Sequence, residues 1–193
     1  MKICMLGTGY VGLVSGACFA DFGNTVWCVD KIEEKIDMLN NSEIPIYEPG
    51  LKEIVKKNFD AGRLKFTTNL TTAINESDLI FICVGTPTSK DGSANLKYVF
   101  QAANEISKNI NKFKIIINKS TVPVSTGDKV EKIISKRVKR NNFEVISNPE
   151  FLREGEAIRD FRFPDRIIVG ANNKKVVKKI RDLYSPLIKK GAT

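Results

Sequence analysis

The chain has 193 residues, the size of one domain or of one domain with a fragment of a second. Apolar residues make up 42% of it and charged residues 27%, as in ordinary globular proteins, and no apolar run approaches the roughly 20 residues of a membrane span. The net charge is +9 and histidine is absent, which excludes histidine-based catalysis and histidine metal ligands within this chain.

The first predicted elements are a strand, a glycine turn, a helix and a second strand. The apolar residues 3–6 precede the sequence GTGYVG at residues 7–12, and a stretch with helical spacing follows. A second apolar run, Thr25–Val29, ends in Asp30. GxGxxG alone often marks an ordinary turn, but strand, turn, helix, strand and acid in this order predict a dinucleotide-binding site.

Each glycine of this turn meets a steric requirement. Gly7 allows the strand to turn sharply, Gly9 leaves room for a pyrophosphate beside the backbone, and Gly12 lets the helix pack closely on the strand. The free N–H groups and the dipole at the start of the helix favour the phosphates.

Asp30 lies 18 residues after Gly12, at the carboxyl end of the second strand. A carboxylate there can accept hydrogen bonds from both ribose hydroxyls and would repel a 2′-phosphate, which favours NAD over NADP. Lys31 and Lys35 weaken this preference, because a nearby cation tolerates the extra phosphate. The alternative is that Asp30 caps a helix that begins before Glu33.

The rest of the chain alternates between helices and strands. Helices are predicted over residues 32–39, 51–60, 70–75, 96–109, 125–138 and 173–189. Strands are predicted over residues 64–67, 79–84, 113–118, 143–146 and 166–169, with loops over 40–50 and 85–95. We therefore expect one α/β domain over residues 1–193, a Rossmann-like, doubly wound, mostly parallel sheet with helices on both faces.

Two clusters of basic residues, 129–140 and 174–190, alternate with apolar residues at helical spacing. This spacing indicates the solvated faces of amphipathic helices, so we expect no nucleic-acid partner, no membrane partner and no metal. Because Lys2 is followed at once by a strand and not by a signal peptide, we expect a cytoplasmic protein. The four cysteines (Cys4, Cys18, Cys28 and Cys83) are predicted to be reduced core thiols.

Ligands of such sheets bind at the carboxyl ends of the strands, and three predicted strands end in unusual loops there. Together with the glycine turn and a late segment, these loops give five motifs: GTGYVGL (7–13), CVGTPT (83–88), KSTVPVST (119–126), NPEFLREGEA (148–157) and FRFPDRIIVG (161–170). Their order and spacing over almost the whole chain resemble the UDP-glucose/GDP-mannose dehydrogenase family, the nucleotide-sugar dehydrogenases.

The resemblance implies an NAD-dependent oxidoreductase that oxidises C6 of a nucleotide sugar twice, here UDP-glucose to UDP-glucuronate with two NAD⁺, for polysaccharide precursors. In the family a cysteine thiolate captures the intermediate aldehyde. Two alternatives stay open: a dehydrogenase for GDP-mannose or UDP-N-acetylmannosamine, and a non-catalytic NAD-binding module.

The resemblance also implies residue roles. The residues expected at the cofactor are Gly7, Gly9, Tyr10, Val11, Gly12, Asp30, Lys35, Thr86, Pro87, Ser120, Thr121 and Glu154. Those expected to form a wall of the sugar site are Glu150, Phe151, Leu152, Arg153 and Glu154. Glu150 would act as acid and base, Thr121 would hold the reactive water and Glu154 would reach the cofactor. Alternatively, Glu150 only begins a helix and Thr121 only belongs to a turn.

The sequence departs from the family pattern in two ways. Ser125 stands where the family usually has glycine, and its hydroxyl is expected to cap the following helix. The family's nucleophilic cysteine, most of its uridine-binding surface and the central helix through which it dimerises lie in a second half, which these 193 residues do not contain. We therefore expect a truncated form that binds NAD, turns over no UDP-glucose and forms a homodimer only with the missing helix.

Overall fold

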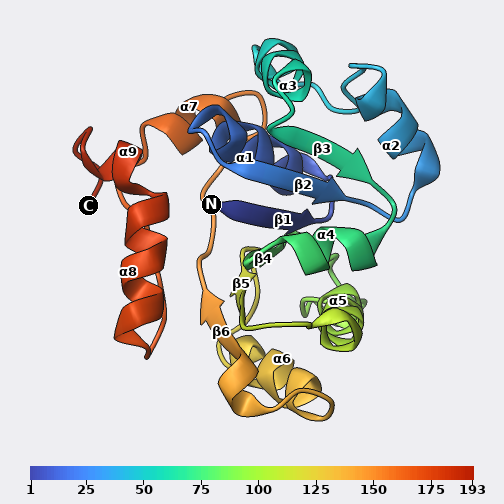
Figure 1. Cartoon of the computed structure of the whole chain (residues 1–193), viewed down its shortest axis with the longest axis vertical. Coiled ribbons are helices and arrows are strands. Elements are labelled where there is room, and N and C mark those ends of the chain that lie inside the picture. The colour runs from blue at the N-terminus through green and yellow to red at the C-terminus, as the bar shows by residue number, and fades with distance from the viewer.

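The structure, a computed structural model, describes residues 1–193 and contains one six-stranded parallel sheet (Figure 1). Its strands are β1 (Lys2–Leu6), β2 (Thr25–Val29), β3 (Leu64–Thr67), β4 (Leu79–Ile82), β5 (Lys114–Asn118) and β6 (Phe143–Ser147). They lie in the order β3-β2-β1-β4-β5-β6, so the chain builds outward from β1 to one edge and then returns to build the other. The predicted doubly wound, Rossmann-like fold is confirmed.

Helices cover both faces of this sheet. They are α1 (Tyr10–Asp21), α2 (Glu33–Asn40), α3 (Leu51–Asp60), α4 (Leu70–Glu76), α5 (Lys97–Asn109), α6 (Thr126–Ser135), α7 (Ala157–Arg162), α8 (Lys174–Leu183) and α9 (Ser185–Ile188), with a 3₁₀ turn at Arg140–Asn142. Figure 1 shows α1, α3 and α7 on one side and α4, α5 and α6 on the other.

Strand side chains alternate between two apolar clusters, one on each face. In β5, Ile115 and Ile117 belong to the cluster under α1, whereas Ile116 belongs to the cluster under α4, α5 and α6. Every residue of β5 is buried, as expected for a strand covered by helices on both sides. No helix is both long and apolar enough to cross a membrane.

Two expectations about the last third of the chain are wrong, and one helix there was not predicted. Residues 166–169 form no strand, and only Gly170 pairs with β6, in an isolated antiparallel bridge to Ser147. Within the segment, the carbonyl oxygen of Ile168 accepts the side chain of Asn148, and the N–H of Ile167 donates to the C-terminal residue, Thr193. The predicted helix over residues 173–189 ends at Leu183, and α9 starts afresh with Pro186 in its first turn. Helix α7 was not predicted, because its six residues are too few for a periodic signal.

The four cysteines are free and buried, as predicted. Burial raises the pKa of Cys18 and of Cys83 to about 12, so neither carries a thiolate at neutral pH. Cys83 lies one residue beyond β4 and not within it, next to the glycine turn.

A buried lysine at the start of β5 closes the end of a neighbouring helix. Lys114 Nζ donates to the carbonyl oxygens of Ile74 (2.6 Å), Asn75 (3.3 Å) and Ser77 (2.5 Å), at the end of α4. The Ile74 carbonyl also accepts the N–H of Ser77, so the ammonium adds a second bond there and supplies a donor to the carbonyls of Asn75 and Ser77 at the helix end. Burial, and next the nearby Lys112, lowers the pKa of Lys114 to about 8.

The titration of Lys114 predicts a stability that rises with pH. Between its folded pKa of about 8 and its ordinary value of 10.5, the unfolded chain binds more protons, so alkali favours folding. From pH 8 to pH 10 we expect the free energy of unfolding to rise by about 2 kcal/mol more in the native chain than in Lys114→Met. Urea denaturation at both pH values measures this difference, and parallel pH profiles of the two proteins would contradict it.

Candidate functional site

The loops that carry the predicted site residues meet at one edge of the sheet, because all six strands are parallel and their carboxyl ends point the same way. Hydrogen bonds tie these loops together. Gly7 N–H donates to the carbonyl oxygen of Val29 (2.8 Å), and Thr86 Oγ1 donates to that of Thr121 (3.0 Å). The edge is therefore a connected surface that extends from β2 across β1, β4 and β5.

The glycine turn lies against the loop after β4 with no room for side chains at two of its positions. Gly7 has φ +106°, and a Cβ there would lie 2.7 Å from the carbonyl oxygen of Cys83. A Cβ at Gly12 would lie 1.9 Å from the carbonyl oxygen of Gly7. The predicted roles of Gly7 in the turn and of Gly12 in close packing agree with this geometry.

Gly9 differs from its neighbours because a Cβ there would meet no protein atom within 4 Å. The adjacent N–H groups of Tyr10, Val11 and Gly12 donate to no protein acceptor, and the first turn of α1 holds no acidic side chain. Open space, free N–H donors and the positive end of a helix dipole together fit the diphosphate of a dinucleotide.

Asp30 lies at the end of β2, where its carboxylate also holds the glycine turn. Oδ2 accepts hydrogen bonds from the backbone N–H (2.9 Å) and the hydroxyl (2.8 Å) of Thr8. Burial alone would raise the pKa of Asp30, but the bonds from Thr8 and Ile32 and the charge of Lys35 lower it on balance. Asp30 therefore stays ionised and keeps acceptor capacity for ribose hydroxyls.

The alternative role of Asp30 as a helix cap is wrong. The N-cap position of α2 is Ile32, whose side chain makes no capping bond, and Asp30 Oδ1 accepts only the N–H of Ile32 itself, at 3.2 Å. Thr8 is a residue that sequence reasoning missed. It is fully buried, and its position inside the GxGxxG sequence was the available signal.

The loops after β4 and β5 place the other predicted cofactor residues. Ser120 is buried, and its hydroxyl donates to the carbonyl oxygen of Val84 (2.7 Å), so this side chain fastens one loop to the other. The side chains of Pro87 and Thr121 are exposed at the same edge. Glu154 is exposed too, and it lies close enough to Tyr10 to help raise the pKa of that phenol, after burial and Glu48.

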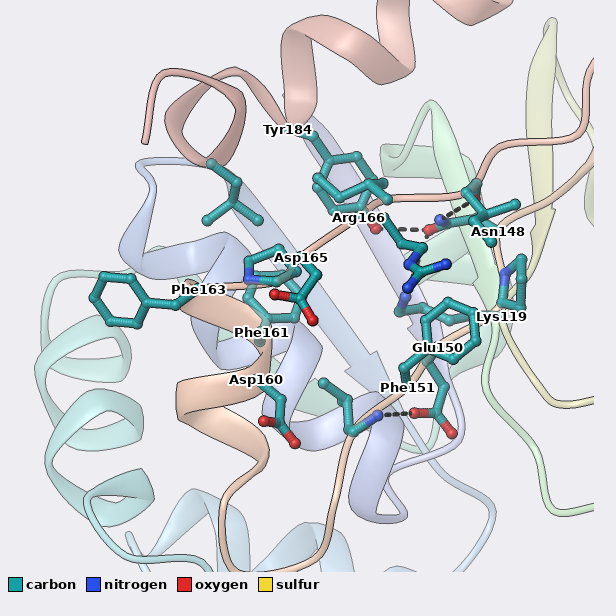
Figure 2. A pocket seen from close by; sticks show the side chains of 16 residues that line it. Lys119, Asn148, Glu150, Phe151, Asp160, Phe161, Phe163, Asp165, Arg166 and Tyr184 are labelled. Carbon is teal, nitrogen blue, oxygen red and sulfur yellow. Dashed lines mark hydrogen bonds between the residues drawn. The ribbon is translucent and has the colours of Figure 1, made fainter. Parts of the chain in front are cut away.

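A cavity of about 540 Å³ opens beside this edge, after β6. Figure 2 shows Lys119, Glu150 and Arg166 gathered on one side of it. Of the predicted sugar-site wall, Glu150, Phe151 and Leu152 line the cavity, whereas Arg153 and Glu154 do not. The guanidinium of Arg153 binds both carboxylate oxygens of Asp160, which lines the cavity, at 3.0 and 2.7 Å.

The Glu150 carboxylate is held by its own loop. Its Oε2 accepts the backbone N–H of Leu152 at 2.5 Å. The alternative that Glu150 only begins a helix is wrong, because the next helix, α7, starts at Ala157.

A buried polar group at the base of the cavity was not predicted. Lys119 is only 4% exposed, and its ammonium donates to Asn148 Oδ1 at 3.4 Å, which also accepts the hydroxyl of Tyr184 at 2.6 Å. Burial lowers the pKa of Lys119 and raises that of Tyr184. Lys119 and Asn148 directly follow β5 and β6, which was a usable signal, whereas nothing in the sequence pointed to Tyr184.

The serine at the start of α6 does not cap it. Ser125 occupies the N-cap position with φ +68°, in the left-handed region, and its side chain makes no capping hydrogen bond. The expected capping role is therefore wrong. This geometry suits glycine, because a Cβ is disfavoured there.

The fold and this edge define a dinucleotide-binding domain with a cavity beside the cofactor position. The model of the UDP-glucose/GDP-mannose dehydrogenase family, NAD binding domain, matches residues 1–188. The chain belongs to this family, and NAD is the cofactor of the domain that it matches.

Individual relatives agree with this assignment. The chain is 53% identical to a UDP-glucose 6-dehydrogenase of Rhizobium meliloti and 52% identical to UDP-glucose 6-dehydrogenase TuaD of Bacillus subtilis, over 97% and 96% of its own length. It covers only 44% and 40% of those proteins. The solved GDP-mannose dehydrogenase of Pseudomonas aeruginosa superposes with a TM-score of 0.95 at 35% identity, covering 100% of this chain and 45% of that one. A UDP-glucose dehydrogenase of Pyrobaculum islandicum gives 0.92 at 38%, covering 96% of this chain and 44% of that one.

A side chain at Gly9 is expected to abolish NAD binding without unfolding the protein. In Gly9→Val the new methyl groups enter the space left for the diphosphate, and we expect the Kd for NAD to rise at least about 100-fold. Stability should fall by only about 1 kcal/mol, the cost of a poorer N-cap residue. Calorimetric titration measures the Kd, and thermal melts measure the stability. Gly12→Ala is the comparison: its new Cβ would clash with Gly7, so this variant should have a much lower melting temperature. Unchanged NAD affinity in Gly9→Val would contradict the placement.

Ser125→Gly is expected to stabilise the protein. Relief of the left-handed strain, about 1–2 kcal/mol, exceeds the entropic cost of glycine, about 0.5–1 kcal/mol, so the free energy of unfolding should rise by about 0.5–1 kcal/mol. Ser135→Gly, at the exposed end of the same helix, is the matched control and should lower it by about 0.5 kcal/mol. Denaturant titrations compare the two, and a loss of stability in Ser125→Gly would refute the argument.

Proposed function

We propose that this chain is the NAD-binding half of a UDP-glucose 6-dehydrogenase, an oxidoreductase that converts UDP-glucose into UDP-glucuronate with two NAD⁺. The observation that carries the proposal is the cavity beside the cofactor edge, whose wall includes Glu150, Phe151 and Leu152. The relatives at 53% and 52% identity, which are named for this activity, support the choice of sugar.

Two cations of the cavity can bind an anionic ligand: Lys119 and Arg166 line it, and neither belongs to any ion pair of the protein. Three carboxylates, those of Glu150, Asp160 and Asp165, line the cavity too, so an anion is favoured only beside the two cations. Ammonium and guanidinium groups bind phosphate and carboxylate oxygens strongly where water is scarce. The cavity thus suits the diphosphate of a nucleotide sugar or the carboxylate of its oxidised product.

NAD, when bound at this edge, would supply the hydride acceptor for oxidation of the sugar. Around it, the N–H groups after Gly9 hold the diphosphate and Asp30 accepts the ribose hydroxyls, with Lys35 nearby. Thr86 and Thr121, joined by their hydrogen bond, place the loops after β4 and β5 along the cofactor. Glu154 approaches the same edge beside Tyr10.

Proton transfer belongs to Glu150. Its Oε2 is held by the N–H of Leu152, which leaves the other oxygen available to exchange a proton with the sugar. The exposed hydroxyl of Thr121 both donates and accepts hydrogen bonds, so it can orient the reactive water molecule. Arg153 and Asp160 hold the segment that carries Glu150 in place.

The chain spans 40% to 45% of the length of the relatives described above. We propose that residues 1–193 are the NAD-binding domain alone, and that the nucleophilic cysteine, the uridine-binding surface and the dimer helix lie in the remainder. The chain then binds NAD and is inactive by itself, because its own four thiols are buried and protonated.

Activity measurements on two polypeptides test the proposal. With NAD and UDP-glucose, the 193 residues alone should form no NADH, whereas a polypeptide of the relatives' length should oxidise UDP-glucose in preference to GDP-mannose and UDP-N-acetylmannosamine. In that longer form Glu150→Gln should lower kcat at least about 100-fold with little change in KM, and Glu144→Gln on β6 serves as the control. Turnover by the 193 residues, or no turnover of any of the three sugars by the longer form, would overturn it; the latter result favours a non-catalytic NAD-binding module.

A further inference from the structure

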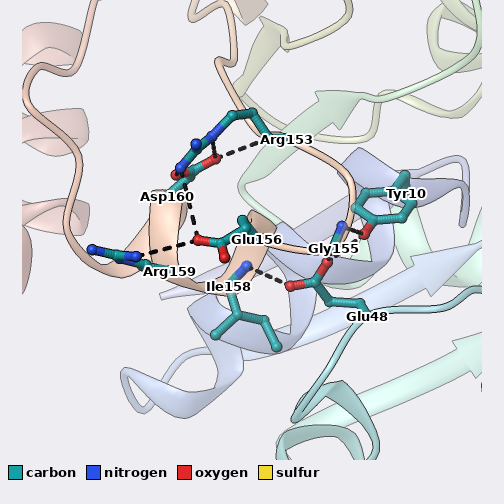
Figure 3. A network of polar contacts seen from close by, with 8 residues as sticks. All are labelled: Tyr10, Glu48, Arg153, Gly155, Glu156, Ile158, Arg159 and Asp160. Atoms are coloured by element: carbon teal, nitrogen blue, oxygen red, sulfur yellow. Dashed lines mark hydrogen bonds and ion pairs between the residues drawn. The ribbon is translucent and has the colours of Figure 1, made fainter.

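One buried carboxylate joins three segments that lie far apart in the sequence. Glu48 is 8% exposed and sits at the end of the loop between α2 and α3. Its Oε1 accepts the backbone N–H of Ile158 at 3.0 Å, and its Oε2 accepts the N–H of Gly155 at 2.9 Å and the hydroxyl of Tyr10 (Figure 3). No arginine or lysine pairs with this carboxylate, so neutral donors alone stabilise its charge.

Tyr10 and Gly155 belong to the two halves of the site. Tyr10 is the first residue of α1, directly after Gly9, where the diphosphate binds. Gly155 directly follows Glu154, at the end of the segment that lines the sugar cavity. A shift of one of these segments therefore changes hydrogen bonds that fix the other.

The far end of α7 is attached to α1 by different contacts. Arg162 donates to Asp21 Oδ2 at 2.8 Å. The rings of Phe161 and Phe19 pack edge to face, with their centroids 5.1 Å apart. These contacts do not involve Glu48. Loss of the Glu48 bonds is therefore expected to release the start of α7 and the segment before it, while the helix stays docked.

We propose that Glu48 is a positioning residue that couples the NAD-binding turn to residues 150–155. When NAD fixes the start of α1, Tyr10 and Glu48 hold Gly155, and through it Glu154 and the segment that carries Glu150. The assignment of this segment to the sugar site rests on the proposed function, but the coupling itself involves only NAD and this chain. Coupling is reciprocal, so a segment held by Glu48 also strengthens NAD binding.

Hydrogen exchange in the 193-residue chain, with and without saturating NAD, tests this coupling. NAD is expected to slow the exchange of the Gly155 and Ile158 amides at least about fivefold in the native protein. In Glu48→Gln the Gly155 amide keeps its bond to the Tyr10 hydroxyl, so the informative amide is that of Ile158, which is bonded to Glu48 and which NAD should then leave unchanged. The amide of Leu13, within α1, should be protected in both proteins. The Kd for NAD should rise about tenfold in Glu48→Gln and stay constant in Glu43→Gln, an exposed glutamate of the same loop.

A purely structural role gives a different pattern. If Glu48 only caps α7, Glu48→Gln lowers the melting temperature, but NAD affinity and the NAD-dependent protection of Ile158 persist; that result overturns the proposal. So does a native protein in which NAD protects neither amide. Because no sugar is present, a wrong sugar assignment leaves these measurements unaffected, whereas the activity assays above detect it.

Tyr10→Phe keeps the proposal testable if Glu48→Gln does not fold. This variant removes the hydroxyl and with it the bonds of Tyr10 to Glu48, to the N–H of Gly155 and to the carbonyl oxygen of Tyr47, and it leaves the bonds of Glu48 to Gly155 and Ile158 intact. It should raise the Kd for NAD to a similar extent and abolish the NAD-dependent protection of Gly155. If both variants fold, the double variant should bind NAD no more weakly than the weaker single one, whereas additive losses would contradict a shared path.

Discussion

The close contact between the glycine turn and the loop after β4 is the constraint on which the site depends. The strand order reverses between β1 and β4, and Gly7 approaches Cys83 there so closely that a Cβ would lie 2.7 Å from its carbonyl oxygen. The same contact aims the start of α1 at the carboxyl edge of the sheet, so its free N–H groups face outward. A ligand at that edge therefore meets donors already in place, and little ordering entropy is lost on binding.

The two halves of the site are held by different kinds of contact. The cofactor half consists of residues that follow β1, β2, β4 and β5 closely in the chain, so the backbone register of the sheet places them. The half that we propose for the sugar depends on side chains from distant segments: Glu48 reaches Gly155, and Asp21 reaches Arg162. Contacts of the second kind can break without loss of the sheet, which makes residues 150–155 the part of the site whose position a ligand can influence.

This difference also explains what the sequence could predict. The strands and longer helices follow from apolar periodicity, and the cofactor edge from glycine spacing and Asp30, because those signals are local. The strand expected at residues 166–169 failed because nothing local shows that its backbone groups bond instead to Asn148 and to the C-terminal residue. Tyr184 and Glu48 were missed for the same reason: each acts on a partner 36 residues or more away in the chain.

The base of the cavity shows why the last helices belong to the site. Tyr184 lies where α8 ends and α9 begins, and its hydroxyl occupies Asn148 Oδ1 at 2.6 Å, the atom to which Lys119 donates at only 3.4 Å. Asn148 Nδ2 is fixed by the carbonyl oxygen of Ile168, so this amide cannot turn to serve Lys119 better. A buried ammonium with one long hydrogen bond keeps unused donors, and an anionic ligand in the cavity can satisfy them. The break between α8 and α9, which places Tyr184 there, thus helps to decide how many donors Lys119 keeps for a ligand.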